Sequence, residues 1–132
     1  MILEAALYNE LSTDAGVVAL ASTRCYPTAI PADAILPAYA CQVFQYPGDL
    51  AHDATEGLKS ARVQVTCTAT TYLAAKNLAR AIKSVLHGTT GEFGGSGGVT
   101  LEYCEVSSLL DGYNFDTDKH TVRIDAMFLY KE

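Results

Sequence analysis

One stretch near the middle of the chain changes its hydrophobic period halfway, and this constrains the fold more than any other feature. Over 61–69 apolar and polar residues alternate strictly, which predicts a strand with one buried face. Over 71–87 apolar residues recur at steps of three and four, which predicts a helix with one apolar stripe. Thr70 or Thr71 can cap its start, and Gly88 is suited to its end. A strand that leads directly into such a helix predicts that the helix packs on the same sheet.

The same alternation returns near the C-terminus and completes a predicted core. Over 121–130 every second residue is apolar, from Val122 to Tyr130, so this stretch is a further strand with one buried face. Both strands and the helix stripe are expected to share one buried layer. Its central members should be Val63, Val65, Leu78, Ile82, Val122 and Ile124.

Weaker patterns complete the predicted order of elements. They are a helix over 2–11, a short helix around 17–20, an extended piece at 24–27, and strands over 39–46 and 99–106. The last of these alternates imperfectly, which indicates a bulge near Tyr103. Asp111-Gly112 and the stretch 116–118 have turn-forming residues. Strands in succession at the end favour an α+β fold, with an antiparallel sheet of about four strands and helices on one face.

The chain has 132 residues, of which 49% are hydrophobic, and this suits one domain over 1–132 with a single core. Two intervals are expected to be flexible loops within it. Residues 47–57 are mostly polar, and residues 88–98 include six glycines. Neither interval has enough apolar area to offset the entropy that is lost when a chain is ordered.

The formal net charge of −6 argues against a protein that grips nucleic acid, but it fits a surface that DNA passes without binding. No apolar run approaches the ~20 residues that cross a bilayer, and the N-terminus has no basic leader. We therefore expect no membrane partner and no signal peptide. The cysteines lie far apart, which predicts reduced thiols in a protein made in a cytosol. They are Cys25, Cys41, Cys67 and Cys104.

No stretch of the sequence predicts catalysis or the binding of a cofactor. The glycines of 91–98 follow a helix instead of a strand and match no phosphate-binding loop. His52, His87 and His120 stand in separate segments without the spacing of metal ligands, and there is no GxSxG motif. We expect no enzyme activity, no cofactor and no metal site.

Basic residues of the central unit are candidates for protein contacts instead. Lys76, Arg80 and Lys83 form a stripe on the exposed side of the predicted helix, and Arg62 lies on the polar face of the preceding strand. A solvated helix face is the simpler explanation of the stripe. The alternative is contact with an acidic partner subunit.

Two apolar residues interrupt the polar face of the last predicted strand. Met127 and Leu129 follow Arg123 and Asp125 on the face opposite the predicted core. They fit either a subunit contact or a sheet edge that the protein's own loops cover.

Four stretches of the chain resemble those of a known family. They are ALYNELSTDAGVVALASTRCYP (6–27), LPAYACQVF (36–44), GLKSARVQVTCTATTYLAAKNLARAIKSVL (57–86) and YNFDTDKHTVRIDAMFLY (113–130). In this order they resemble the tail-completion family of long-tailed bacteriophages, also called tail terminators or head-to-tail joining proteins. The segment TATT (68–71) departs from the family pattern, where an aspartate is expected before the Thr-Tyr pair. This departure affects a helix cap and not the function.

The resemblance implies a structural virion protein that forms a ring, typically hexameric, at the head-proximal end of a tail. Such a ring stops polymerisation of the tail tube, meets the tube protein and the head completion or neck protein, and lets DNA pass. The protein would be made in the host bacterial cytoplasm and end up in the virion. Acidic residues at Asp49, Asp53 and Glu56 are candidates for the channel or an arm, since acids repel phosphates. A small-molecule-binding or other α+β interaction module, and a cytosolic enzyme, remain as alternatives.

Overall fold

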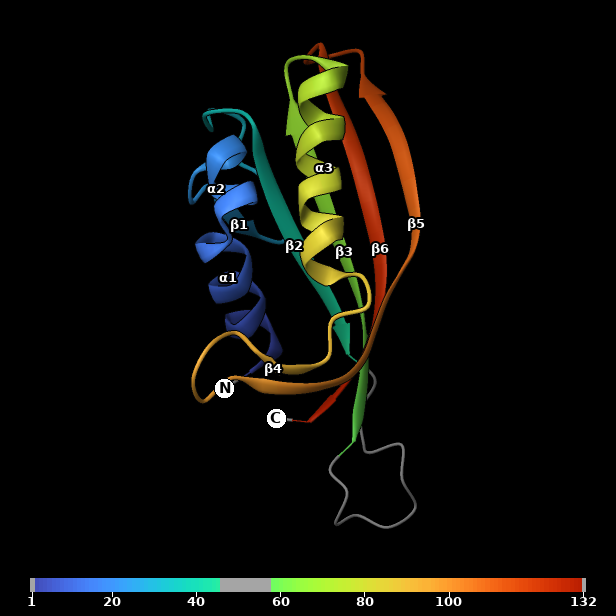
Figure 1. Ribbon diagram of the computed structural model, residues 1–132. Coiled ribbons are helices and arrows are strands. Elements are labelled where there is room, and N and C mark those ends of the chain that lie inside the picture. The colour runs from blue at the N-terminus through green and yellow to red at the C-terminus, as the bar shows by residue number, and fades with distance from the viewer. Residues whose placement is uncertain (1, 46–57, 132) are drawn as a thin grey trace.

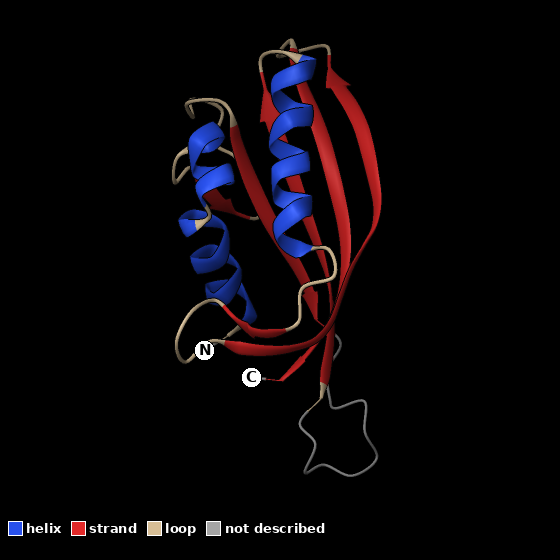
Figure 2. Cartoon of the chain, in the orientation of Figure 1, coloured by secondary structure: helices blue, strands red, loops and turns tan. Residues whose placement is uncertain are grey.

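The computed structural model describes residues 2–45 and 58–131, which form a curled six-stranded sheet with its helices on one face (Figures 1 and 2). The elements are α1 (Leu3–Thr13), α2 (Ala15–Ala21), β1 (Cys25–Pro27), β2 (Ala38–Gln45), β3 (Lys59–Ala69), α3 (Tyr72–Leu86), β4 (Gly91–Phe93), β5 (Val99–Asn114) and β6 (Lys119–Lys131). The strand order is β1-β2-β3-β6-β5-β4. β1 pairs with β2 in parallel, and every other pairing is antiparallel. The α+β class is confirmed.

The central unit of β3 and α3 has the predicted form. Every second residue of β3 from Ala61 to Ala69 is buried, and α3 buries the predicted stripe. Thr71 caps the helix, because its hydroxyl accepts a hydrogen bond of 3.2 Å from the Ala74 backbone N–H. Gly88 follows the helix with a φ of +77°, a conformation that glycine adopts without strain.

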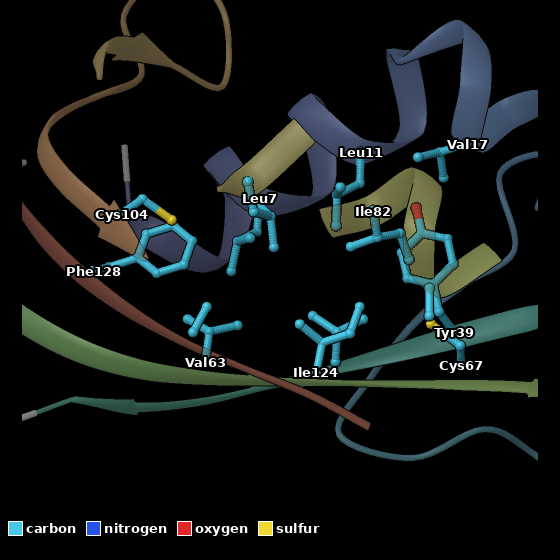
Figure 3. Packing of buried hydrophobic residues seen from close by; sticks show 14 of the residues in the cluster. Leu7, Leu11, Val17, Tyr39, Val63, Cys67, Ile82, Cys104, Ile124 and Phe128 are labelled. Carbon is cyan, nitrogen blue, oxygen red and sulfur yellow. The ribbon is translucent and has the colours of Figure 1, made fainter. Parts of the chain in front are cut away.

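The predicted core is confirmed, since all six of its named residues are fully buried. Side chains of the helices point onto the sheet, as Leu7, Leu11 and Ile82 do toward Val63 and Ile124 (Figure 3). The helices bury one stripe each because their apolar residues recur at helical spacing. The sheet buries one face because its residues alternate.

The sheet has six strands where about four were predicted. β1 and β4 form its two edges and have three residues each, so neither is long enough to show a period of two. β4 lies inside the glycine-rich interval 88–98, and its Phe93 is buried against Phe128 with ring centroids 5.9 Å apart. The flexibility expected of this interval stays a prediction, and residues 47–57 lie outside the described chain.

β5 is twice as long as predicted because Asp111-Gly112 does not form a turn. A Cβ atom at Gly112 would lie 2.7 Å from the Thr121 hydroxyl oxygen, so the glycine allows close strand pairing here. The register shift between Leu101 and Tyr103 confirms the predicted bulge. The chain reverses at the other predicted turn, between β5 and β6.

Candidate interaction surfaces

One face of the sheet has no helix over it within the described chain, because α1, α2 and α3 all lie on the same side (Figure 2). We call the opposite side the outer face. The strand register places four side chains of this face in one row across β2, β3, β6 and β5. They are Phe44, Arg62, Met127 and Glu105.

The outer face carries an apolar band that includes the two residues selected from the sequence. Met127 and Leu129 are half-buried there, and Tyr103 of β5 is the register partner of Leu129. Phe44 is 63% exposed at the end of the row. β6 lies between β3 and β5, so the alternative that Met127 and Leu129 mark a sheet edge is wrong. We refer to Phe44, Tyr103, Met127 and Leu129 as the outer apolar band.

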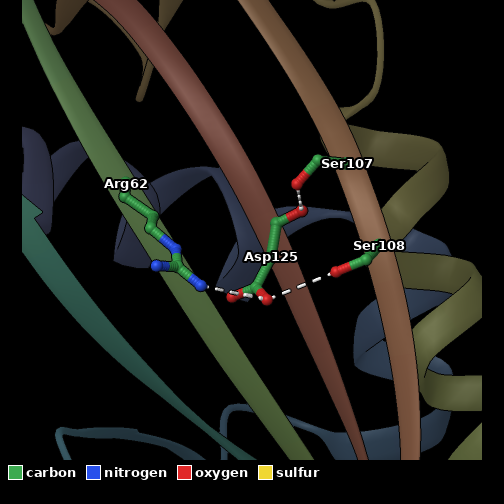
Figure 4. A network of polar contacts seen from close by, with 4 residues as sticks. All are labelled: Arg62, Ser107, Ser108 and Asp125. Carbon is green, nitrogen blue, oxygen red and sulfur yellow. Dashed lines mark hydrogen bonds and ion pairs between the residues drawn. The ribbon is translucent and has the colours of Figure 1, made fainter.

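A polar network lies directly beside this band (Figure 4). Arg62 Nη2 lies 3.4 Å from Asp125 Oδ2, and the Ser108 hydroxyl donates to the same oxygen at 3.3 Å. The Ser107 hydroxyl donates to the Asp125 backbone carbonyl at 3.1 Å. The Asp125 side chain is only 18% exposed, and its Oδ1 atom is buried without a hydrogen-bond partner in the described chain. A buried acceptor of this kind is costly unless a donor reaches it.

Lys76 forms an ion pair within the chain. Its Nζ lies 2.9 Å from Asp111 Oδ1 on β5, and the Tyr72 hydroxyl donates to Asp111 Oδ2 at 2.9 Å. The hydrogen bonds from Lys76 and then Tyr72 hold the pKa of the Asp111 carboxyl below its ordinary value. The same bond raises the pKa of the Lys76 ammonium. The ion pair of Lys76 with Asp111 therefore links α3 to β5.

Arg80 and Lys83 remain free of ion pairs in the described chain. With Ser84 and His87 they line a shallow hollow of about 400 Å³ on the exposed side of α3. His87 is part of this surface and also satisfies a backbone donor of the sheet, because its Nδ1 accepts a hydrogen bond from the Val106 N–H of β5.

A second, apolar hollow of about 560 Å³ lies between α1 and the strands β1 and β2. Tyr8, Cys25, Cys41 and Val43 are among its lining residues. The Cys41 thiol donates a hydrogen bond to the Cys25 sulfur and so lowers the pKa of Cys25, against the effect of burial. All four cysteines are free thiols.

The structure separates the sequence-predicted residues into groups. Arg62, Met127 and Leu129 share the outer face, whereas Lys76, Arg80 and Lys83 lie on α3. Asp49, Asp53 and Glu56 lie outside the described residues.

Sequence reasoning missed the contacts of Asp111 and Asp125, because these contacts join strands and helices far apart in the chain. It also missed the exposed aromatics Phe44 and Phe115. The alternation pattern placed Arg62 on the polar face of its strand, but the partner of a side chain depends on the strand register.

Within residues 2–45 and 58–131, no three His, Cys, Asp or Glu side chains gather where they could hold a metal ion. No helix of the described chain is both long and apolar enough to cross a membrane. The fold defines an α+β domain with its helices on one face of the sheet.

The family model of the tail completion protein gp17 matches residues 5–131, and the chain belongs to this family. The resemblance seen in the sequence is thereby confirmed. Family membership makes the chain a structural component of a phage-like tail, located in the virion, and not an enzyme.

A chain in the solved virion of a native gene transfer agent particle has a similar fold. The two share 22% sequence identity with a TM-score of 0.69, over 98% of this chain and 95% of the other. At this identity the likeness concerns the fold alone. The comparison with curated proteins finds no match.

Proposed function

We propose that this protein forms a closed ring, with six copies as the expected number, at the head-proximal end of a phage tail. The ring ends polymerisation of the tail tube and joins the tail to the head or neck. Its partners are further copies of itself, the tail tube protein and a head completion or neck protein. The observation that carries this proposal is the family match over residues 5–131.

A ring of identical copies repeats one heterologous contact, so each copy needs two different surfaces. The outer apolar band supports the first, because apolar side chains grouped on an uncovered sheet face are commonly buried in assemblies. Arg62 lies in the same row, between Phe44 and Met127, and its side chain is 48% exposed and so open to a neighbouring copy. Arg80 and Lys83, which lack acidic partners in the described chain, support the second surface.

DNA passes through the proposed ring as it leaves the head. A net charge of −6 favours an opening that repels phosphates over one that holds them. Asp49, Asp53 and Glu56 are the proposed acids of the channel or of an arm beside it, on the basis of their sequence position.

The decisive experiment measures assembly and its effect on tubes. Light scattering after sizing chromatography gives the mass in solution, and negative-stain images give the symmetry. Purified protein is then added to polymerising tail tube protein, and tube lengths are compared with and without it. We expect closed rings and shorter tubes. A species that stays monomeric or dimeric, leaves tube length unchanged and binds small apolar molecules in the hollow beside Cys25 would favour the ligand-binding alternative.

A further inference from the structure

One end of the sheet gathers exposed aromatic side chains that the core does not use. Strand pairing brings the end of β3, the start of β6 and the end of β5 together, and α3 begins at the same end (Figure 1). We call this cluster the aromatic end and define it as Tyr72, Leu73, Tyr113 and Phe115. Phe115, in the turn between β5 and β6, is 87% exposed.

The turn that carries Phe115 is held by several side chains. The Tyr113 ring meets the Phe115 ring edge to face at 4.9 Å and the His120 ring at 4.7 Å. Asn114 Oδ1 accepts hydrogen bonds from the backbone N–H groups of Asp116 at 2.9 Å and Thr117 at 3.4 Å. The Phe115 ring is therefore exposed to solvent on a turn whose conformation is fixed by these contacts.

An ordered, exposed aromatic ring is well suited to anchor a protein contact. Aromatic anchors that enter a pocket carry a large share of binding free energy at many interfaces. Because side chains already fix the turn, less conformational entropy is lost when Phe115 binds than for a mobile loop.

The charges around Phe115 indicate what kind of surface it meets. Asp116 and Asp118 lie in the same turn, and Lys119 alone follows them as a cation. Two copies that met through this end would bring their own carboxylates together, which is unfavourable. A partner with Lys or Arg around an apolar socket would be complementary.

We propose that the aromatic end docks the chain onto a different protein, whose facing surface offers an apolar socket for Phe115 bordered by Lys or Arg. This inference rests on the proposed function, because a ring between tube and neck has an unlike protein on each side. It assigns one of those axial contacts to the β5–β6 turn, apart from the outer apolar band and the α3 cations.

The test compares rings of wild-type protein with rings of Phe115→Asp, Phe115→Leu and Asp116→Lys. Each is mixed with purified tail tubes and, in a separate sample, with purified heads. The tubes and the heads both come from phage assembly without this protein. Binding is measured by co-sedimentation at low and high salt. Ile2→Asp is the matched control, since Ile2 is also an exposed apolar residue but lies directly before α1, which is not part of the aromatic end.

We expect all variants to form rings and to melt like the wild type. Phe115→Asp should weaken docking to one of the two neighbours about 30-fold or more, as for a hot-spot residue. Phe115→Leu should retain most of the binding, and Asp116→Lys should weaken it and reduce its salt dependence. Normal docking of both Phe115→Asp and Asp116→Lys on tubes and heads would overturn the inference, as would rings that fail to close in these variants. A wild-type protein that forms no rings would instead overturn the proposed function.

Discussion

Gly94 lies so close to Ala6 that a Cβ atom on the glycine would stand 2.5 Å from the Ala6 Cα atom. The Gly94 N–H also donates to Glu10 Oε1 at 3.1 Å, and the Asn9 side-chain amide donates to the Gly94 carbonyl at 3.4 Å. These contacts join the first helix to the residue after β4, 84 to 88 positions away in the sequence. The curl of the sheet brings this edge beneath α1 (Figure 1).

Replacing Gly94 by alanine should therefore weaken the protein in two ways. The residue has a φ of +88°, which disfavours alanine, and the added methyl group meets helix backbone. We expect a loss of about 2–4 kcal/mol in the free energy of unfolding, measured by urea denaturation. Gly95→Ala is the matched control, because Gly95 has a φ of +86° but no atom within 4 Å of the added position. Equal losses in both variants would contradict the role of the Ala6 contact.

The fold could be predicted from sequence where one hydrophobic period persists over several helical turns or along a whole strand. β3, α3 and β6 meet this condition. The edge strands β1 and β4 do not, and their pairing depends on partners distant in the chain. Asp111-Gly112 has the composition of a turn but lies within β5. Gly112 allows the strand to approach Thr121 closely, and Asp111 forms an ion pair with Lys76. Residue types typical of turns do not by themselves reveal such tertiary contacts.

Leu78 offers a direct test of the packing of α3 on the sheet. Its side chain is fully buried in the core, so Leu78→Ala should reduce the free energy of unfolding by about 2–5 kcal/mol. Leu73→Ala on the same helix is the control, since Leu73 is 68% exposed and leaves no cavity. A loss below about 0.5 kcal/mol for Leu78→Ala in denaturant melts would be inconsistent with this packing.

The ion pair of Lys76 and Asp111 should give stability a small dependence on pH. The pKa of Asp111 is lower in the folded protein, so its contribution is present above the ordinary aspartate pKa and disappears as pH falls through the lowered value. The pKa of Lys76 is raised, so its contribution persists below the ordinary lysine pKa and is lost as pH rises through the raised value. Both side chains reach solvent at the surface, which keeps the effect small.

This dependence can be measured as the difference in melting temperature between the wild type and Asp111→Asn. The difference should shrink in acid, where the wild-type carboxyl is protonated, and reach its full size near neutral pH. Added salt should reduce it, because exposed ion pairs are screened. A difference that is constant from acid to neutral pH would show that the carboxylate charge is not involved.

The cysteines should differ in their reactivity toward iodoacetamide near neutral pH. Cys25 is half-exposed with a lowered pKa, so more of it is thiolate and can react. Burial raises the pKa of Cys67 well above its ordinary value and that of Cys104 to about 12. Peptide mass spectrometry of briefly treated, folded protein should find Cys25 modified first. Modification of Cys67 before Cys25 would contradict the described burial.

The sequence could predict single residues of the candidate surfaces, but not the contacts that these residues make. Alternation placed Arg62, Met127 and Leu129 on one face of the sheet. It could not show that β6 is central or that Asp125 forms an ion pair with Arg62, because both depend on which strands are neighbours. Helical spacing likewise grouped Lys76 with Arg80 and Lys83, whereas only Lys76 reaches Asp111 on β5.

The outer apolar band should respond to charge if it is a subunit contact. Met127→Asp with Leu129→Asp places two carboxylates in the centre of the band, where burial against a neighbour would be costly. We expect the double variant to remain folded by circular dichroism, to lose the ring on sizing chromatography and to fail in completing tails. Val18→Asp with Leu20→Asp, at exposed apolar positions of α2 on the helix side, controls for the added charge. A Met127 and Leu129 variant that still closes rings and completes tails would remove the outer face from the ring contact and leave the α3 cations as the surface to test next.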